Sequence, residues 1–187
     1  MNKKINIIAL SGSLRQDSYN TAAIKAVQEI AGEQYEIEIA DISDFPLYNQ
    51  ELDGPNAPTQ VQALAKKILA ADAILFSTPE YNYSIPGVLK NAIDWLSTQP
   101  SQPFNGKPAA IISSSMGMLG GARAQYHLRQ VMVFLNVHLI NKPEIMIASA
   151  HEKFDENGAL TDEVTKGLIG QMITALATMR SQLKTPQ

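Results

Sequence analysis

The sequence contains no cysteine among its 187 residues. This absence excludes disulfide bonds, a thiolate nucleophile, and zinc or iron–sulfur centres with cysteine ligands. Long hydrophobic runs are also missing, because no stretch approaches the ~20 apolar residues of a membrane-spanning helix. There is no basic block either: 15 Lys and Arg against 18 Asp and Glu give a net charge of −3. That balance argues against binding nucleic acid through phosphate neutralisation.

Signals for metal binding and for export are equally scarce. His127, His138 and His151 are scattered and lack the spacing of metal ligands, so we expect no metal site. Residues 5–10 form the first apolar stretch, which is too short for the core of a signal peptide. We therefore expect a cytoplasmic protein that does not enter a membrane, folded as a single domain over residues 1–187.

Strand and helix patterns alternate along the chain. Apolar runs at 5–10, 73–77 and 109–113 predict strands buried on both faces, whereas residues 35–40 alternate with acidic side chains and predict a half-exposed edge strand. Apolar residues at helical spacing predict a helix after each strand. These stripes are Ala23, Ile24, Val27, Ile30 and Ala31; Val61, Leu64, Ala65, Ile68 and Leu69; Leu89, Ala92, Ile93 and Leu96; and Ala124, Leu128, Val131 and Leu135.

The end of the chain completes the pattern. A fifth strand is expected within 137–147, interrupted by Pro143. Thr161 can cap a last helix, with Asp162 and Glu163 in its first turn. The buried stripe of that helix is predicted to be Val164, Leu168, Met172, Leu176 and Met179.

Five β–α units in strict alternation predict an α/β fold: a three-layer sandwich with a five-stranded parallel sheet and helices on both faces. A buried first strand fits the flavodoxin-like strand order 2-1-3-4-5. Ligands of such folds bind at the carboxyl ends of the strands. Three unusual loops lie there, at 11–19, 78–85 and 113–121.

The first loop connects a buried strand to a helix start, whose unpaired N–H groups and partial positive charge attract anions. Three serines and Arg15 add further donors. The loop lacks both Gly-x-x-x-x-Gly-Lys and Gly-x-Gly-x-x-Gly, so one terminal phosphate fits better than a triphosphate or a pyrophosphate. The alternative is a plain polar loop in which Ser18 or Asn20 caps the helix.

The second loop is stiffened by Pro79 and Pro86, and its two tyrosines suit a flat heteroaromatic ligand. We expect Glu80 to be a structural anchor or to provide a backbone hydrogen-bond donor, rather than to act as a catalytic acid. The glycines of the third loop would let backbone approach a ligand, and Met116 and Met118 could pack on a ring. A merely flexible loop is the alternative.

Two further features concern the helix at 121–135. Arg123, His127 and Arg129 form a candidate anion patch for the electron donor, with an interhelix or subunit contact as the alternative. The helix is apolar on several faces, which suggests a subunit interface.

The long segment 41–58 contains three prolines and is expected to be functional or interface-forming.

Three motifs together resemble the NADPH-dependent FMN reductase family, and within it the bacterial quinone, chromate and azo-dye reductases. They are Ser-Gly-Ser-Leu-Arg-x-x-Ser-x-Asn at 11–20, Pro-Glu-Tyr-Asn-Tyr-Ser-Ile-Pro-Gly-x-Leu-Lys-Asn-Ala-Ile-Asp-Trp at 79–95, and Gly-Gly-Ala-Arg-x-Gln-Tyr-x-Leu-Arg-Gln at 120–130. The resemblance extends over nearly the whole chain and implies a flavodoxin-like fold with non-covalent FMN.

The resemblance also implies the site. The FMN phosphate would be held by Ser13, Arg15, Ser18 and Asn20, within a binding stretch that includes Leu14 and Tyr19. The isoalloxazine ring would be lined by Pro79, Glu80, Tyr81, Asn82 and Tyr83, and at its other edge by Ser115, Met116 and Gly117.

The implied activity is hydride transfer from NADPH or NADH through FMN to quinones, azo compounds, chromate or free flavin. The cofactor supplies this chemistry, so no catalytic side chain is assigned. The family also implies a homodimer or homotetramer. The alternatives are a flavodoxin-type electron carrier, which the modest charge disfavours, and an FMN-binding sensor without NAD(P)H turnover.

Overall fold

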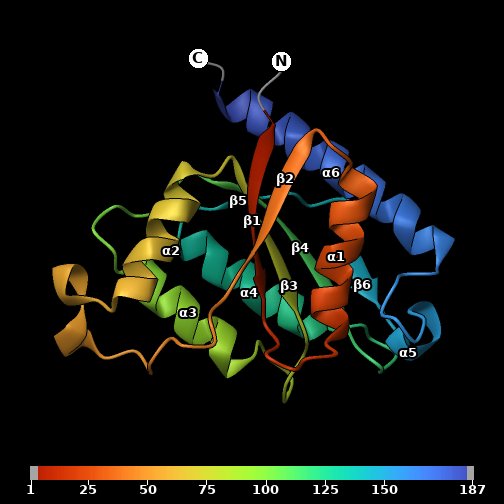
Figure 1. Cartoon of the computed structure of the whole chain (residues 1–187), viewed down its shortest axis with the longest axis horizontal. Coiled ribbons are helices and arrows are strands. Elements are labelled where there is room, and N and C mark those ends of the chain that lie inside the picture. Colours follow the sequence, from red (N-terminus) through yellow and green to blue (C-terminus); the bar gives the residue numbers. More distant parts are fainter. Residues whose placement is uncertain (1–3, 185–187) are drawn as a thin grey trace.

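The computed structural model describes residues 4–184 and consists of one parallel sheet between two layers of helices (Figure 1). Its elements, in chain order, are β1 (Ile5–Ser11), α1 (Tyr19–Ala31), β2 (Tyr35–Ala40), the 3₁₀ helices η1 (Gln50–Leu52) and η2 (Gly54–Asn56), α2 (Thr59–Ala70), β3 (Ala73–Thr78), α3 (Gly87–Ser97), β4 (Pro108–Ser114), α4 (Ala122–Phe134), β5 (His138–Leu139), β6 (Ile145–Ile147), α5 (Ala150–Lys153) and α6 (Glu163–Lys184).

The strand order is β2-β1-β3-β4-β5, which confirms the predicted flavodoxin-like topology. The fifth strand is present in two pieces, because β5 pairs with the start of β4 and β6 with its end. Pro143, joined to Lys142 by a cis peptide bond, lies between the pieces. A proline has no N–H for the ladder, so the predicted interruption is confirmed.

Alternate residues of the strands contact opposite helix layers. Ile8 and Phe76 belong to the core shared with α2, α3 and α4, while Ile7 and Leu75 belong to the core shared with α1 and α6. The central strands are therefore buried on both sides, as predicted. The edge strand β2 alternates between half-buried and exposed residues over most of its length.

The start of α6 corrects two predictions. Asp162, and not Thr161, caps the helix: its carboxylate accepts hydrogen bonds from the backbone N–H and the hydroxyl of Thr165. The Thr161 hydroxyl instead donates to the carbonyl of Lys153. Val164 is 73% exposed. The rest of the predicted stripe is confirmed, because Met172 and Leu176 are buried and Leu168 and Met179 pack against the same core, which Thr165, Ile169 and Ile173 complete.

Much of the segment 41–58 is fixed to α3. The indole N–H of Trp95 donates to the carbonyl of Pro46 at 2.7 Å, and the Asn91 amide bonds the backbone of Pro46 and Tyr48. The Tyr48 ring meets Trp95 edge-on at 5.1 Å. These contacts hold the segment beside α3. Within residues 4–184, no helix has the length and apolar character needed to cross a membrane.

Candidate cofactor-binding site

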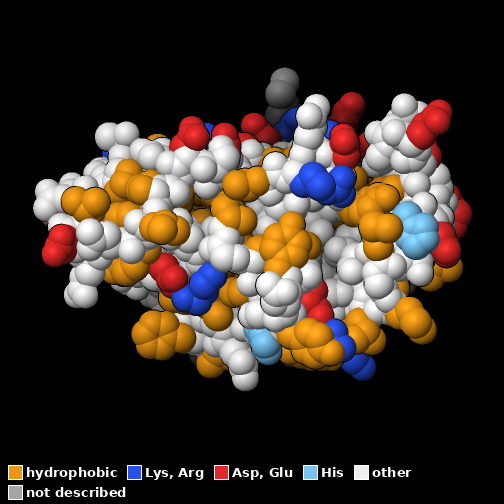
Figure 2. Space-filling model, turned by 90° about the horizontal axis from the view of Figure 1, so that it is seen from below, with side chains coloured by type: hydrophobic (Ala, Val, Ile, Leu, Met, Phe, Trp, Pro, Cys, Tyr) orange, Lys and Arg blue, Asp and Glu red, His pale blue; other side chains and the backbone are white. Residues whose placement is uncertain are grey.

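A hollow of about 370 Å³ opens where the three predicted loops meet, at the carboxyl ends of β1, β3 and β4. Figure 2 looks onto the end of the molecule that is lowest in Figure 1 and shows hydrophobic side chains spread over it, with few charged ones between them. The hollow is lined by Ser13, Arg15, Ser18, Tyr19, Asn20, Pro79, Glu80, Tyr81, Ser114, Ser115 and Met116.

The first loop forms the polar end of the hollow. Ser18 is the N-cap of α1, and its hydroxyl accepts hydrogen bonds from the N–H groups of Asn20 and Thr21. The exposed guanidinium of Arg15 lies 5.5 Å from the centre of the Tyr19 ring. One helix start therefore presents a serine pair, Ser13 and Ser18, and a cation to the same space, an arrangement that suits a phosphate.

Asn20 fastens this end of α1 to the sheet. Its side chain is buried, and its amide bonds both the carbonyl and the N–H of Ser114 at 3.0 Å. The Ser77 hydroxyl donates to the backbone carbonyl of Asn20 at 2.8 Å. Asn20 thus supports the hollow from β3 and β4, and its contact with a phosphate stays a prediction.

The second loop ends in a tight turn at 81–84. Tyr81 and Ser84 exchange both backbone hydrogen bonds at 3.0 Å. Asn82 and Tyr83 between them have φ values of 50° and 68°, the left-handed conformation that two-residue hairpin turns require. The rings of Tyr81 and Tyr83 are both exposed, and Tyr81 lines the hollow.

Glu80 anchors this loop to α4. One carboxylate oxygen accepts from the backbone N–H groups of Arg123 and Ala124, at 3.0 and 3.4 Å, and the other pairs with the Arg123 guanidinium at 2.6 Å. Helix α4 has no capping side chain of its own, so Glu80 supplies the acceptor that its first turn lacks. The structure supports the anchor interpretation over an acid.

Gly120 and Gly121 of the third loop allow a close approach within the protein itself. A Cβ on Gly120 would lie 2.7 Å from the backbone of Met146, and one on Gly121 would lie 2.9 Å from Cβ of Ser113. These two glycines therefore allow the loop to pack closely against β6 and β4. Their φ values of 57° and 87° also favour glycine.

The loop is further held by a buried side chain that sequence reasoning missed. The Gln125 amide donates to the Ser113 hydroxyl at 2.8 Å and to the carbonyl of Ile145 at 2.7 Å. The Ser113 hydroxyl in turn donates to the carbonyl of Gly120. The available signal was Gln125 itself, a polar residue at an inward-facing position of the helix that follows the Gly-Gly pair.

The three residues of the predicted anion patch each have a partner within the protein, and their binding of an anion stays a prediction. Arg123 is paired with Glu80, and Nδ1 of His127 contacts the Ser84 hydroxyl at 3.0 Å. Arg129 points elsewhere, because its guanidinium bonds the carbonyl of Ile140 at 3.3 Å and lies 3.8 Å from the carboxylate of Glu144. Spacing along a helix predicted proximity but not the partners that neutralise each charge.

The structure brings most of the predicted site residues into one hollow. Leu14, Asn82, Tyr83 and Gly117 are the predicted residues that do not line it. Ser114 is a lining residue that was not predicted. Its hydroxyl is buried and, like Gln125 Oε1 and Arg129 Nε, has no hydrogen-bond partner among the described residues.

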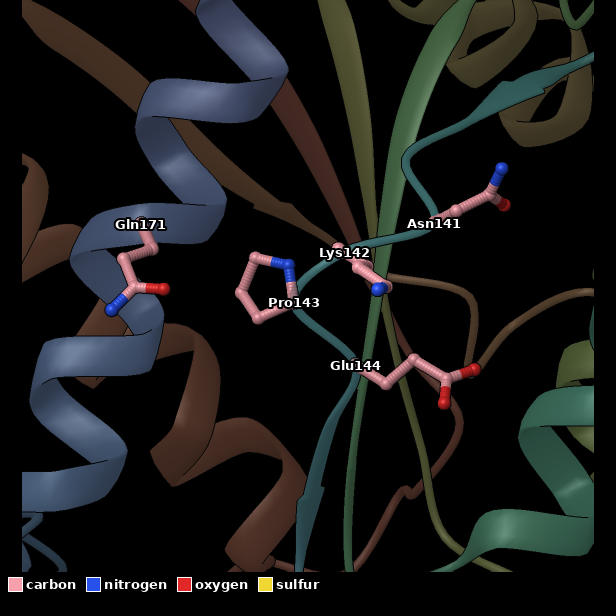
Figure 3. Close-up of a pocket in the computed structure, with 5 residues that line it drawn as sticks. All are labelled: Asn141, Lys142, Pro143, Glu144 and Gln171. Atoms are coloured by element: carbon pink, nitrogen blue, oxygen red, sulfur yellow. The ribbon is translucent and has the colours of Figure 1, made fainter.

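A larger hollow, of about 500 Å³, lies away from these loops, between the β5–β6 connection and α6 (Figure 3). The Pro143 ring faces the side where Gln171 lies, while Asn141 and Glu144 point away from it. None of the predicted site residues lines this space. Within residues 4–184 no group of His, Asp and Glu could hold a metal ion.

Comparisons with known proteins agree with this geometry. A sequence model of the NADPH-dependent FMN reductase family matches residues 5–152. The chain is 53% identical over 176 residues to an NAD(P)H-dependent FMN reductase of Pseudomonas aeruginosa, covering 94% of this chain and 95% of that protein. It is 43% identical over 187 residues to a quinone reductase of Escherichia coli K12, covering 98% and 100%.

A solved structure is similar over the same extent. The flavoenzyme NAD(P)H:(acceptor) oxidoreductase FerB of Paracoccus denitrificans superposes with a TM-score of 0.87 at 35% identity, covering 95% of this chain and 98% of that one. Sequence motifs, strand order and relatives along nearly the full length lead to one conclusion. The chain is a flavodoxin-like oxidoreductase that belongs to the NADPH-dependent FMN reductase family.

Proposed function

We propose that this enzyme binds FMN in the hollow between the three loops and uses it to pass electrons from NAD(P)H to quinones. One observation carries the proposal. A single hollow joins the phosphate-type donors of the first loop to the aromatic turn of the second and to residues 114–116 of the third. A phosphorylated flat cofactor has the same two ends.

The residues present fit FMN. Ser13, Ser18 and Arg15 would hold the phosphate at the start of α1, and Pro79–Tyr81 and Ser115–Met116 would line the ring. The unpartnered Ser114 hydroxyl offers one more hydrogen bond to a bound group. When bound, FMN would supply acceptance of a hydride and its delivery to the quinone, which takes its further proton from solvent, so the residues of this chain need to position the reactants.

Quinones are the acceptors that the surroundings favour. Tyr81 and Met116 line the hollow, and Tyr83 and Met118 are exposed on the same two loops; such side chains suit flat apolar molecules. Arg123 is neutralised by Glu80, which makes the rim less suited to a small dianion such as chromate. Azo compounds share the flat aromatic shape, and they and free flavin are further acceptors in this proposal.

We also infer that the chain is a homodimer or homotetramer, assembled through α4. Val133 and Phe134 at the end of this helix are 79% and 89% exposed, although neighbouring Met132 is buried. Two large apolar side chains side by side on a surface are typical of an interface. Light scattering of the wild type and of Phe134→Glu tests this, and a wild-type monomer would contradict it. The cytoplasmic location stays a prediction.

An anaerobic titration tests the proposed function. The protein is loaded with FMN, NADPH is added without an acceptor, and the flavin absorbance is followed. Rapid bleaching that a quinone then reverses is the expected result. Bound flavin that stays oxidised would favour an electron carrier or a sensor, and failure to retain FMN would overturn the assignment of the hollow.

A further inference from the structure

The Glu80 carboxylate combines three interactions in one place. It accepts from the backbone N–H groups of Arg123 and Ala124, the second and third residues of α4, and it pairs with the guanidinium of Arg123 in the same helical turn. The Glu80 side chain is only 12% exposed, against 38% for Arg123. A partly buried, charge-assisted set of this kind holds its geometry far better than an exposed ion pair.

The same guanidinium also holds the next residues of the loop. The Arg123 guanidinium carbon lies 3.8 Å from the centre of the Tyr83 ring, a close cation–π contact. His127, one turn further along α4, contacts the Ser84 hydroxyl. Helix α4 therefore contacts the second loop at three successive points, namely Glu80, Tyr83 and Ser84.

The 81–84 turn needs such support. Hairpin turns with two left-handed residues favour Asn-Gly, but this chain has tyrosine at the second position, with φ at 68°. A bulky residue in that conformation is strained and persists only where its surroundings fix it. Figure 1 shows the connection from β3 to α3 projecting beyond the carboxyl ends of the strands, where the sheet gives it no support.

We propose that Glu80 and Arg123 are positioning residues, which set the 81–84 turn at the cofactor ring through the three contacts with α4. This proposal rests on the proposed function, because it assumes that the second loop lines the flavin. It also replaces the expectation that Arg123 binds the anionic donor. With its charge paired to Glu80 and its face covered by Tyr83, the guanidinium acts through the loop.

The experiment compares four variants of the FMN-loaded enzyme: Arg123→Ala, Glu80→Gln, the double variant, and Lys67→Ala. Lys67→Ala breaks the exposed ion pair between Lys67 on α2 and Glu38 on β2, and it serves as the matched control. Three quantities are measured: the Kd of FMN, the visible absorption and circular dichroism of the bound flavin, and the KM for NADPH at several salt concentrations. Thermal unfolding of each variant without FMN checks that it folds.

We expect both single variants to raise the Kd of FMN about tenfold and to change the flavin spectrum in the same direction. The double variant should be little worse than either, because the two residues act as one unit. The salt dependence of the KM should stay as in the wild type, and Lys67→Ala should match the wild type throughout. Arg123→Lys, which restores the charge but not the planar stack, should recover part of the affinity.

Two results would overturn the proposal while leaving the proposed function intact. In the first, the variants bind FMN with wild-type affinity and an unchanged spectrum. In the second, Arg123→Ala raises the KM for NADPH and weakens its salt dependence while Glu80→Gln behaves as the wild type, which would make Arg123 a donor-binding residue. A wild-type protein that fails to bind FMN would instead overturn the proposed function, and this proposal with it.

Discussion

The side-chain amide of Asn20 is paired with the backbone of Ser114, 94 positions further along the chain. Nδ2 donates to the Ser114 carbonyl and Oδ1 accepts from the Ser114 N–H, each at 3.0 Å. The pair connects the first turn of α1 with the last residue of β4. Both residues line the hollow, so this link sets the distance between the phosphate end and the third loop.

Replacing Asn20 by alanine should destabilise the protein by about 2 kcal/mol or more. Both polar groups of the Ser114 backbone would lose these bonds in a buried place, and each buried unpaired group costs roughly 1–3 kcal/mol. Urea unfolding of the protein without FMN measures the loss. Asn105→Ala is the control, because Asn105 bonds Asn136 on the exposed surface. Equal unfolding free energies for Asn20→Ala and the wild type would contradict the supporting role.

Much of the fold could be predicted because the buried strands are recognisable from their apolar composition. Runs such as 73–76 are apolar throughout and alternate with helical stripes, so the strand order and the ligand-binding edge could be predicted. The details that failed depend on pairings between distant residues. Glu80 meets the start of α4 across 43 positions, and no local pattern shows which carboxylate caps which helix.

The protein contacts of Gly120 and Gly121 in the third loop were not predicted, for a related reason. A glycine signals close approach or a left-handed φ, but the sequence does not say whether the approaching group is a ligand or the protein's own backbone. Here it is Met146 and Ser113. Ser114 was missed because three successive serines look alike in a sequence, and the structure shows that Ser114 lines the hollow together with the predicted Ser115.

Arg15→Ala should weaken FMN binding by about 1.5–3 kcal/mol, the range for a hydrogen bond to a charged group. Arg15 forms no ion pair with any residue that the structure describes, so its charge is available to a phosphate. Riboflavin, which lacks the phosphate, should bind the variant and the wild type alike. Fluorescence titration with both flavins separates the cases, and an unchanged Kd for FMN would contradict the phosphate assignment.

The cap of α6 predicts an effect of pH on stability. Hydrogen bonds from the Thr165 hydroxyl and N–H hold the pKa of Asp162 below its ordinary value of 3.8. A carboxylate with a lowered pKa in the folded state stabilises the protein above that ordinary value, and this contribution is lost as the pH falls through the folded-state pKa. Asp162→Asn should therefore be less stable than the wild type at pH 7, with the difference shrinking as the pH falls below about 4.

Thermal unfolding between pH 7 and pH 2.5 follows that difference. Asparagine is itself a good N-cap, so the difference at pH 7 should be under about 1 kcal/mol and arise from the lost charge at the helix start. A stability difference between the wild type and Asp162→Asn that grows as the pH falls would contradict the role of Asp162 as the cap.

Two glycine substitutions should change stability in opposite directions. Gly121 has φ at 87°, and a Cβ there would lie 2.9 Å from Cβ of Ser113, whose hydroxyl binds the buried Gln125 amide. Gly121→Ala should therefore cost about 1–3 kcal/mol, from backbone strain and overpacking together, and it should also weaken FMN binding because the third loop moves.

Gly167 lies exposed within α6 with open space around the position of a Cβ, so Gly167→Ala should stabilise the protein by about 0.5–1 kcal/mol. Urea unfolding of both variants with and without FMN distinguishes these effects, and a Gly121→Ala protein as stable as the wild type would mean that the third loop does not depend on this close approach.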